Sequence, residues 1–255
     1  PRGVLARGLG RSYGDAAQSG GASVIDLEQM SSISLNASTG AVTVGTGVSF
    51  HDLLLATVPA GFFVPVSPGT RMVTVGGAIA ADVHGKNHHV EGSFGNHVQE
   101  IKLVNGLGEL RALNPDDAQS QEQFWATVGG MGLTGVITEA TFKMIPISSS
   151  LISVDTERCA DLDKVMARMI ESDSQYRYSV AWIDSLSASG RGVITRGDHA
   201  TLDQLPEHKR ATALAYAPKA LAKTPGFIPS GLLNKFTVRA FNEAWYRKAP
   251  KHEQG

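Results

Sequence analysis

Apolar and polar residues follow strand and helix spacing in short alternating runs over the first part of the chain. Ser49 precedes apolar residues at helical spacing, and Asp52 stands three positions later, so this pair predicts a capped helix start. Thr74 stands in the same way before a second short helix, whose positive end would face an anion. The elements expected here are strands over 24–27 and 41–44 and helices over 49–58 and 76–81.

A hairpin, a helix and a half-buried strand are expected next. The hairpin is indicated by a turn sequence that starts at Asn105, and the helix by Asn114 followed by Pro115. The strand is indicated by alternating apolar and polar residues. The expected elements are hairpin strands over 101–104 and 109–113, a helix from Asn114 to Thr127, and a strand over 136–144.

Pro146 and the serines at 148–150 indicate a domain boundary. We therefore expect two domains: residues 1–147, which begin inside a domain whose N-terminal part is missing, and residues 148–255, which form an incomplete second domain. Beyond about residue 200 the pattern dissolves into Pro, Gly and Lys with isolated aromatics, which predicts a long mobile segment. The second domain is expected to start an antiparallel sheet, with a helix over 162–170 and strands over 176–183 and 191–195.

Composition excludes several classes of protein. The chain has 255 residues, a net charge of −1 and no cluster of Lys or Arg, so it lacks the positive surface of a nucleic-acid-binding protein. Cys159 is the single cysteine, which excludes an internal disulfide and a thiolate metal cluster. No apolar run reaches the roughly 20 residues of a membrane span, and the residues from Pro1 to Ala6 are not expected to be a signal peptide. The 28 glycines indicate that loops carry much of the function.

Three glycine-rich runs stand out against this background. They are 8–15, 67–77 leading into 81–89, and 128–137. Glycine lets the backbone approach a ligand closely, and the N–H groups of such loops can point at phosphate oxygens. The first run is not a Rossmann fingerprint, because Tyr13 stands where its third glycine should fall, and no Walker A lysine–serine pair occurs. One loop alone is weak evidence, but three in series indicate a shared phosphate-bearing ligand.

Four blocks of sequence resemble one family of flavoproteins. They are Gly8-Leu9-Gly10-Arg11-Ser12-Tyr13-Gly14-Asp15, 68–71 with 74–77, His84-Gly85-Lys86-Asn87-His88-His89 with 92–97, and 124–130. These blocks resemble the decaprenylphosphoryl-β-D-ribose 2′-oxidase family, which is of the vanillyl-alcohol-oxidase type. The likeness runs through nearly the whole chain and is weakest between about 147 and 175. It implies an α+β fold: a PCMH-type FAD-binding domain of two α/β subdomains, then the start of an antiparallel-sheet substrate domain.

The resemblance also implies which residues hold FAD. The first loop would wrap the diphosphate, and backbone N–H groups suit that ligand better than cationic side chains do. Ile137 would contact the adenine end through its backbone. The implied cofactor-binding residues are Ala6, Arg7, Gly8, Leu9, Gly10, Arg11, Ser12, Tyr13, Gly14, Asp15, Ala16, Gly69, Thr74, Val75, Gly76, Gly77, Ala81, Asp82, Val83, His84 and Ile137.

Arg11 predicts how the flavin is attached. Several relatives in the superfamily carry a histidine at this place in the first loop and link it covalently to the flavin. A guanidinium does not form that bond. We therefore expect FAD to be held noncovalently.

The implied reaction takes a hydride from C2′ of the ribose to the flavin and yields a 2′-keto sugar, the first half of an epimerisation to the arabinose form used in cell-wall arabinan. His84, Lys86 and Tyr13 are the candidates for lining the pocket, with Lys86 facing substrate phosphate; the catalytic base is not identifiable here. The resemblance further implies a quinone-type electron acceptor, a separate NAD-dependent keto-reductase, a location at the periplasmic side of the cell envelope, and a peripheral membrane contact.

Several features of the sequence allow other interpretations. The chain is alternatively an FAD-dependent alditol or sugar-lactone oxidase that uses oxygen, against which the block from His84 to His89 argues, or a non-catalytic FAD-binding fragment. The histidines at 84, 88, 89 and 97 lack helical spacing and accompanying carboxylates, so no metal site is expected. Trp125 is expected in the core. The strand that contains Trp182 and the aromatics of 234–236 and 245–248 fit either a lipid-chain entrance or a surface left by a missing partner domain.

Overall fold

A computed structural model describes residues 3–218 and 231–254 of the chain. It contains two compact units. The first unit consists of Pro1–Ser148 and Leu214–Tyr216, and the second of Ser149–Ala213 and Ala217–Gly255. The first unit is therefore made of two stretches that lie far apart in the sequence.

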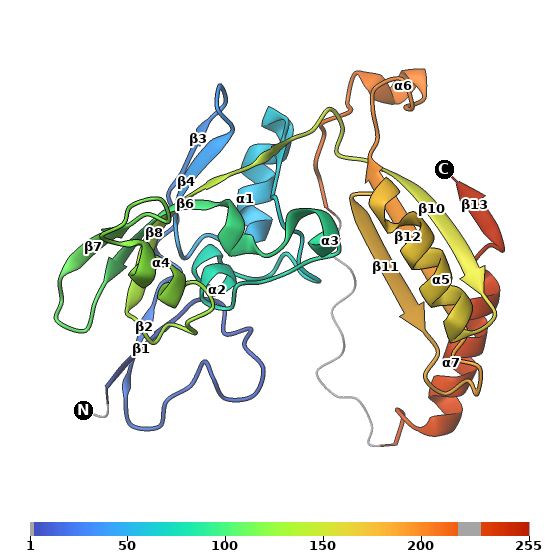
Figure 1. The fold of residues 1–255 in the computed structure, drawn as a ribbon, viewed down its shortest axis with the longest axis horizontal. Helices are drawn as coiled ribbons and strands as arrows, with labels where there is room; N and C mark the ends of the chain where they lie inside the picture. The colour runs from blue at the N-terminus through green and yellow to red at the C-terminus, as the bar shows by residue number, and fades with distance from the viewer. Residues whose placement is uncertain (1–2, 219–230, 255) are drawn as a thin grey trace. The chain divides into compact units, whose positions relative to one another are not determined.

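The first unit is built on a five-stranded antiparallel sheet (Figure 1). In β4 (Ala41–Gly45), Val42 and Val44 are fully buried, and Thr43 on the opposite face hydrogen bonds to Thr141 of the neighbouring strand at 2.8 Å. Two small pairs lie outside this sheet, the parallel β1 (Val4–Arg7) with β2 (Ser23–Asp26) and the antiparallel β5 (Phe62–Phe63) with β9 (Ile145–Pro146). The strands of the sheet, in spatial order, are β3 (Ile33–Asn36), β4 (Ala41–Gly45), β8 (Val136–Lys143), β6 (Val98–Val104) and β7 (Leu110–Leu113).

Short helices complete the core of this unit. Ser49 caps α1 (Phe50–Thr57) by accepting a hydrogen bond from Asp52 N–H, and its hydroxyl also donates to the Asp52 carboxylate at 2.6 Å, as the sequence predicted. The core gathers four fully buried phenylalanines, Phe50, Phe94, Phe124 and Phe142, and half-buried Tyr216 from the returning segment packs against it. The helices are α1 (Phe50–Thr57), η1 (Val58–Ala60), α2 (Val75–Ala80), α3 (His88–Glu91), η2 (Phe94–His97) and α4 (Gln121–Thr127).

The predicted helix start at Asn114 is wrong, because α4 begins only at Gln121. The Asn114 side chain accepts a hydrogen bond from Asp116 N–H at 2.8 Å, and the Asp117 carboxylate accepts one from Gln119 N–H. Side chains of this type compete with helix formation by closing local turns. The stretch before Gln121 is therefore a series of turns.

The second unit is a four-stranded antiparallel sheet with helices beside it. Asp161 caps α5 (Leu162–Ser172) by accepting from Lys164 N–H at 2.7 Å, and α5 buries Val165 against Cys159 and Ile194. The strands, in spatial order, are β11 (Tyr178–Ile183), β12 (Gly192–His199), β10 (Ile152–Cys159) and β13 (His252–Gln254), and the helices are α5 (Leu162–Ser172), η3 (Asp173–Gln175), α6 (Glu207–Arg210) and α7 (Lys235–Lys248).

The expectation of a long structureless segment after about residue 200 is wrong for the described residues there. The 14-residue helix α7 is capped by Asn234, whose side chain accepts from Phe236 and Thr237 N–H. Thr237 completes a capping box by accepting from Asn234 N–H. The strand β13 then pairs with β10. Part of the predicted segment, residues 219–230, lies outside the described residues. The α+β fold class predicted from the sequence is confirmed.

Candidate functional site

The first glycine-rich loop lies against the cap of α2. A Cβ atom on Gly8 would stand 2.4 Å from the Thr74 hydroxyl oxygen and 2.6 Å from its methyl carbon. That hydroxyl is engaged, because it accepts from Gly77 N–H at 3.2 Å and thereby caps α2. The structure thus brings the first two glycine-rich runs together, as one shared site requires, and only glycine at residue 8 allows the approach.

The two runs differ in which backbone donors they leave for a ligand. Within the described part of the chain, no backbone N–H of residues 8–16 donates to another residue, and Gly10 and Gly14 take positive φ of 60° and 61°. In α2, by contrast, Val75 N–H donates to Val48 O and Gly76 N–H to Thr46 O, at 2.9 and 3.0 Å. The expectation that the first N–H groups of α2 point at an anion is therefore wrong, since these groups donate within the protein.

The loop from His84 to His89 is held by a buried amide. Asn87 is fully buried, and its side chain donates to Pro65 O at 2.6 Å and accepts from Ser67 N–H at 3.4 Å. Lys86 N–H donates to Ser67 O, and a Cβ atom on Gly85 would stand 2.2 Å from that oxygen. The backbone beside Gly69 and the histidine loop are therefore fixed to one another. Asn87 was missed from the sequence, where nothing separates it from its polar neighbours.

The third glycine-rich run packs on the C-terminal end of α2. Gly129 N–H donates to Ile79 O and Met131 N–H to Ala80 O, at 3.0 and 2.8 Å. Asp82 has a positive φ of 40°, and its carboxylate accepts from Gly95 N–H at 2.9 Å. A non-glycine residue in this conformation is uncommon and strained. The helix α2 thus joins the three runs, because its N-terminal cap Thr74 meets the first run and its C-terminal end holds the third.

The predicted pocket residues are exposed. Tyr13 is fully exposed and touches neither of the other two, and His84 and Lys86 lie together at the surface of the histidine loop. The His84 and His88 rings meet edge to face with their centroids 5.6 Å apart. Ile137 lies in β8 with a buried side chain, and its carbonyl accepts the Thr46 hydroxyl. Its contact with adenine stays a prediction.

Two further observations concern residues singled out in the sequence. Trp125 was expected in the core but is 44% exposed, with its ring edge to face against buried Phe124. It lies outside because α4 turns only Phe124 and Thr127 into the core. Among the residues that the structure describes, no group of three or more His, Cys, Asp or Glu is placed to hold a metal ion.

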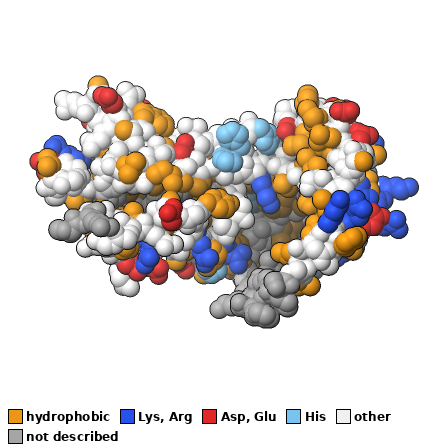
Figure 2. Space-filling view, turned by 90° about the horizontal axis from the view of Figure 1, so that it is seen from below, with side chains coloured by type: hydrophobic (Ala, Val, Ile, Leu, Met, Phe, Trp, Pro, Cys, Tyr) orange, Lys and Arg blue, Asp and Glu red, His pale blue; other side chains and the backbone are white. Residues whose placement is uncertain are grey.

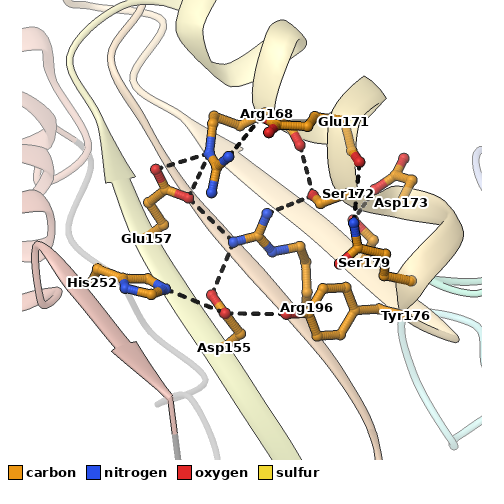
Figure 3. A network of polar contacts seen from close by, with 11 residues as sticks. Asp155, Glu157, Arg168, Glu171, Ser172, Asp173, Tyr176, Ser179, Arg196 and His252 are labelled. Carbon is orange, nitrogen blue, oxygen red and sulfur yellow. Dashed lines mark hydrogen bonds and ion pairs between the residues drawn. The ribbon is translucent and has the colours of Figure 1, made fainter.

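The second unit holds a buried ion network that the sequence did not reveal (Figure 3). Arg196 of β12, only 2% exposed, pairs with Asp155 and Glu157 of β10 at 2.9 and 3.2 Å and donates to the Ser172 hydroxyl. Burial alone would raise the pKa of Asp155, but hydrogen bonds from Arg196, His252 and Tyr176 outweigh it and lower that pKa. A shift of β12 along β10 would separate these ion pairs and leave a buried charge unpaired, which is costly. The network therefore favours the observed register of the two strands.

A family comparison identifies the first unit. Residues 2–114 match a model described as the FAD binding domain. Over this stretch the chain is similar to that family. FAD is therefore the cofactor of this domain, and the stretch matched contains the first two glycine-rich runs and the histidine loop. The open backbone donors of residues 8–16, beside glycines that admit no side chain, fit a diphosphate.

Individual relatives agree with this assignment. The chain is 48% identical, over 97% of its length, to decaprenylphosphoryl-beta-D-ribose oxidase of Mycolicibacterium smegmatis, of which it covers 55%. It is 36% identical, over 82% of its length, to an uncharacterized Streptomyces coelicolor protein, of which it covers 58%. It is 28% identical over 59% of its length to a putative D-arabinono-1,4-lactone oxidase of Neurospora crassa, of which it covers 26%. The chain thus spans little more than half the length of the first two, and the resemblance predicted from its motifs is confirmed.

Proposed function

We propose that the protein containing this chain uses FAD to oxidise the ribose 2′-hydroxyl of decaprenylphosphoryl-β-D-ribose to a 2′-keto sugar. The observation that carries the proposal is the 48% identity to a decaprenylphosphoryl-beta-D-ribose oxidase, which extends over 97% of the chain and so beyond the FAD domain into the second unit. Bound FAD would supply the hydride acceptor. The residues of this chain would bind the cofactor, orient the sugar and shape the pocket.

The cofactor would be held mainly by backbone. Residues 8–16 offer N–H groups that no described residue uses, and Gly69 and Gly77 lie in the adjoining runs. Thr74 supports this surface by capping α2 under Gly8. Because the flavin diphosphate carries two negative charges, several fixed backbone donors stabilise it without a dedicated cation. The remaining predicted contacts, from Ala81 to His84 and at Ile137, complete the proposed cofactor site.

Tyr13, His84 and Lys86 are the proposed pocket residues. Their side chains are exposed and available to a ligand. The backbone of Lys86 is fixed by Ser67 O and its neighbour Asn87 is buried, so the ammonium group has a defined starting point from which to reach substrate phosphate. The His84 side chain would hydrogen bond to a sugar hydroxyl.

The proposal also covers the electron acceptor, the enzyme that uses the product and the location of the protein. The reduced cofactor would pass its electrons to a quinone-type acceptor, and an NAD-dependent keto-reductase would convert the keto sugar to the arabinose form. We propose a location at the cell envelope with peripheral contact to the membrane. In the described part of the chain, no helix combines the length and apolarity needed to cross a bilayer.

The proposal is tested by anaerobic reduction of the flavin. The full-length protein, loaded with FAD, is mixed with a polyprenylphosphoryl ribose, and bleaching of the flavin absorbance is followed alongside formation of the keto sugar. Rapid bleaching with a one-to-one yield of keto sugar is expected. A loaded protein that this substrate does not bleach would refute the proposed oxidation.

A sugar-lactone oxidase is the second candidate, since one relative carries the name putative D-arabinono-1,4-lactone oxidase. That match covers 59% of the chain, whereas the match to the ribose oxidase covers 97%. The same measurement separates the two. Bleaching by a free alditol or aldonolactone, followed by fast reoxidation in air, would favour this second candidate.

A further inference from the structure

The helix α7 and the two leucines before it present an apolar surface to the outside. We call it the C-terminal apolar face. The rings of Phe241 and Trp245 stack with their centroids 6.2 Å apart and their planes at 16°. Phe241 and Trp245 form the centre of this face, and Leu232, Leu233 and Phe236 add exposed apolar surface at the N-terminal end of the helix; all five are between 48% and 83% exposed.

The opposite side of α7 holds the helix to its own unit by polar contacts. Asn242 is buried and donates to the Asp184 carboxylate at 2.7 Å, and Glu243 pairs with Arg191 at 2.6 Å. The Arg191 guanidinium lies 4.5 Å from the centre of the Tyr246 ring. An ordinary surface helix turns its apolar side inward and its polar side to water. Here the docked side is held by polar contacts and by the Tyr246 ring, whereas Phe236, Phe241 and Trp245 are exposed.

The charge around this face is positive. Exposed Lys235, Arg239, Arg247 and Lys248 lie on α7, whose one acidic residue, Glu243, is paired with Arg191 and Arg247. The whole chain has a net charge of −1, so this excess of cations is a local property. Figure 2, seen from below relative to Figure 1, shows hydrophobic and basic side chains next to one another at the surface.

We propose that the C-terminal apolar face binds the surface of an anionic phospholipid bilayer. Helices that lie in a membrane interface combine Trp, Phe and Leu with Lys and Arg, and their affinity rises with buried apolar area and with the negative charge of the lipids. Basic residues near the apolar side chains would pair with headgroup phosphates while the aromatic rings enter the headgroup region. The biological use of this contact rests on the proposed function, because a polyprenyl-linked substrate lies in a membrane.

Vesicle binding tests the proposal without any substrate. The 255-residue chain is sedimented with phosphatidylcholine vesicles that contain or lack phosphatidylglycerol, and binding is expected mainly to the anionic vesicles. Phe241→Ser with Trp245→Ser should weaken binding by about tenfold or more, and Arg239→Gln with Lys248→Gln should remove the preference for phosphatidylglycerol. The matched control is Leu107→Ser with Leu110→Ser, a pair of exposed apolar residues in the first unit that should bind like the parent.

A second measurement follows the fluorescence of the Trp245 indole ring. In a Trp125→Phe, Trp182→Phe background, the fluorescence of Trp245 should shift to the blue on adding anionic vesicles. Failure of the parent chain to bind these vesicles, or unchanged binding by the folded Phe241 and Trp245 variant, overturns the proposal. Light scattering gives a further outcome against the proposal: the parent chain is a dimer, and the Phe241 and Trp245 variant is a monomer that still binds lipid. That result would mean that the face binds a second copy of the chain. Flavin reduction in detergent tests the oxidase reaction separately.

Discussion

The Thr74 hydroxyl lies where a side chain on Gly8 would have to go, 2.4 Å from the position of its Cβ atom. The same hydroxyl caps α2 through Gly77 N–H. One pair of residues therefore joins the loop that carries open backbone donors to the helix that forms the second glycine-rich run.

The variant Gly8→Ala should weaken FAD binding by about tenfold or more, because the new methyl group forces Thr74 from its cap and moves the loop. Binding is measured by titrating the apoprotein with FAD and following flavin fluorescence. Gly20→Ala is the matched control, since a Cβ atom there meets no other atom within 4 Å. Equal affinities of the two variants would contradict the role given to Gly8.

The variant Asn87→Asp should destabilise the first unit by about 1–3 kcal/mol, because a carboxylate oxygen cannot donate to Pro65 O and leaves a buried carbonyl unpaired. Urea unfolding measures the effect. The control is Asn114→Asp, where an exposed side chain keeps its role as acceptor from Asp116 N–H and the stability should hardly change. FAD affinity should fall only in Asn87→Asp, because only that change loosens the histidine loop.

The flavin should leave the protein on acid precipitation. Arg11 stands in the exposed first loop, and a guanidinium does not form the covalent link that a histidine forms with flavin in several relatives. After precipitation and centrifugation, the yellow colour should be in the supernatant, with the mass of the polypeptide unchanged. Colour retained in the washed pellet would show a covalent bond and contradict the prediction.

The second unit should lose stability as the pH falls below about 6.5. Burial lowers the pKa of His199 below its usual 6.5, against a hydrogen bond to Ser149 O that raises it. The unfolded chain therefore takes up a proton at this residue before the folded chain does, so the contribution is present above pH 6.5 and is lost as the pH falls through the lower, folded pKa.

The variant His199→Gln lacks this titration, so its unfolding free energy should change less between about pH 7.5 and 5.5 than that of the parent. Urea unfolding at both pH values gives the difference. The pKa of Asp155 is lowered from its usual 3.8, so the titration of this carboxyl does not affect the unfolding free energy between these two pH values. An identical pH slope in the two proteins would show that His199 titrates alike in the folded and unfolded states.

Local signals in the sequence were enough for much of the fold. The Ser49 and Asp52 cap and the alternation of β8 depend on neighbouring residues, so their outcome could be worked out from spacing alone. The helix α7 was missed because its aromatic residues face outward and disguise the helical pattern. The capping box of Asn234 and Thr237 was the signal that could have found it.

The contacts that hold the candidate site together are not local. Asn87 reaches back to Pro65 and Ser67, and Thr74 meets Gly8, which is 66 positions earlier by residue number. A single sequence gives no measure of which polar residue will be buried and which will stay in water. The glycines in the sequence indicated where two backbone segments pack closely. Which residue packs against each glycine could be seen only in the structure.

The return of Leu214–Tyr216 to the first unit has a consequence for the order of synthesis. A ribosome makes residues 149–213, which belong to the second unit, before the segment that completes the core of the first unit emerges. Folding domain by domain from the N-terminus is the usual course. The core of the FAD domain is therefore completed only after Tyr216 has been synthesised, so its final packing is coupled to the synthesis of residues 149–213 of the second unit.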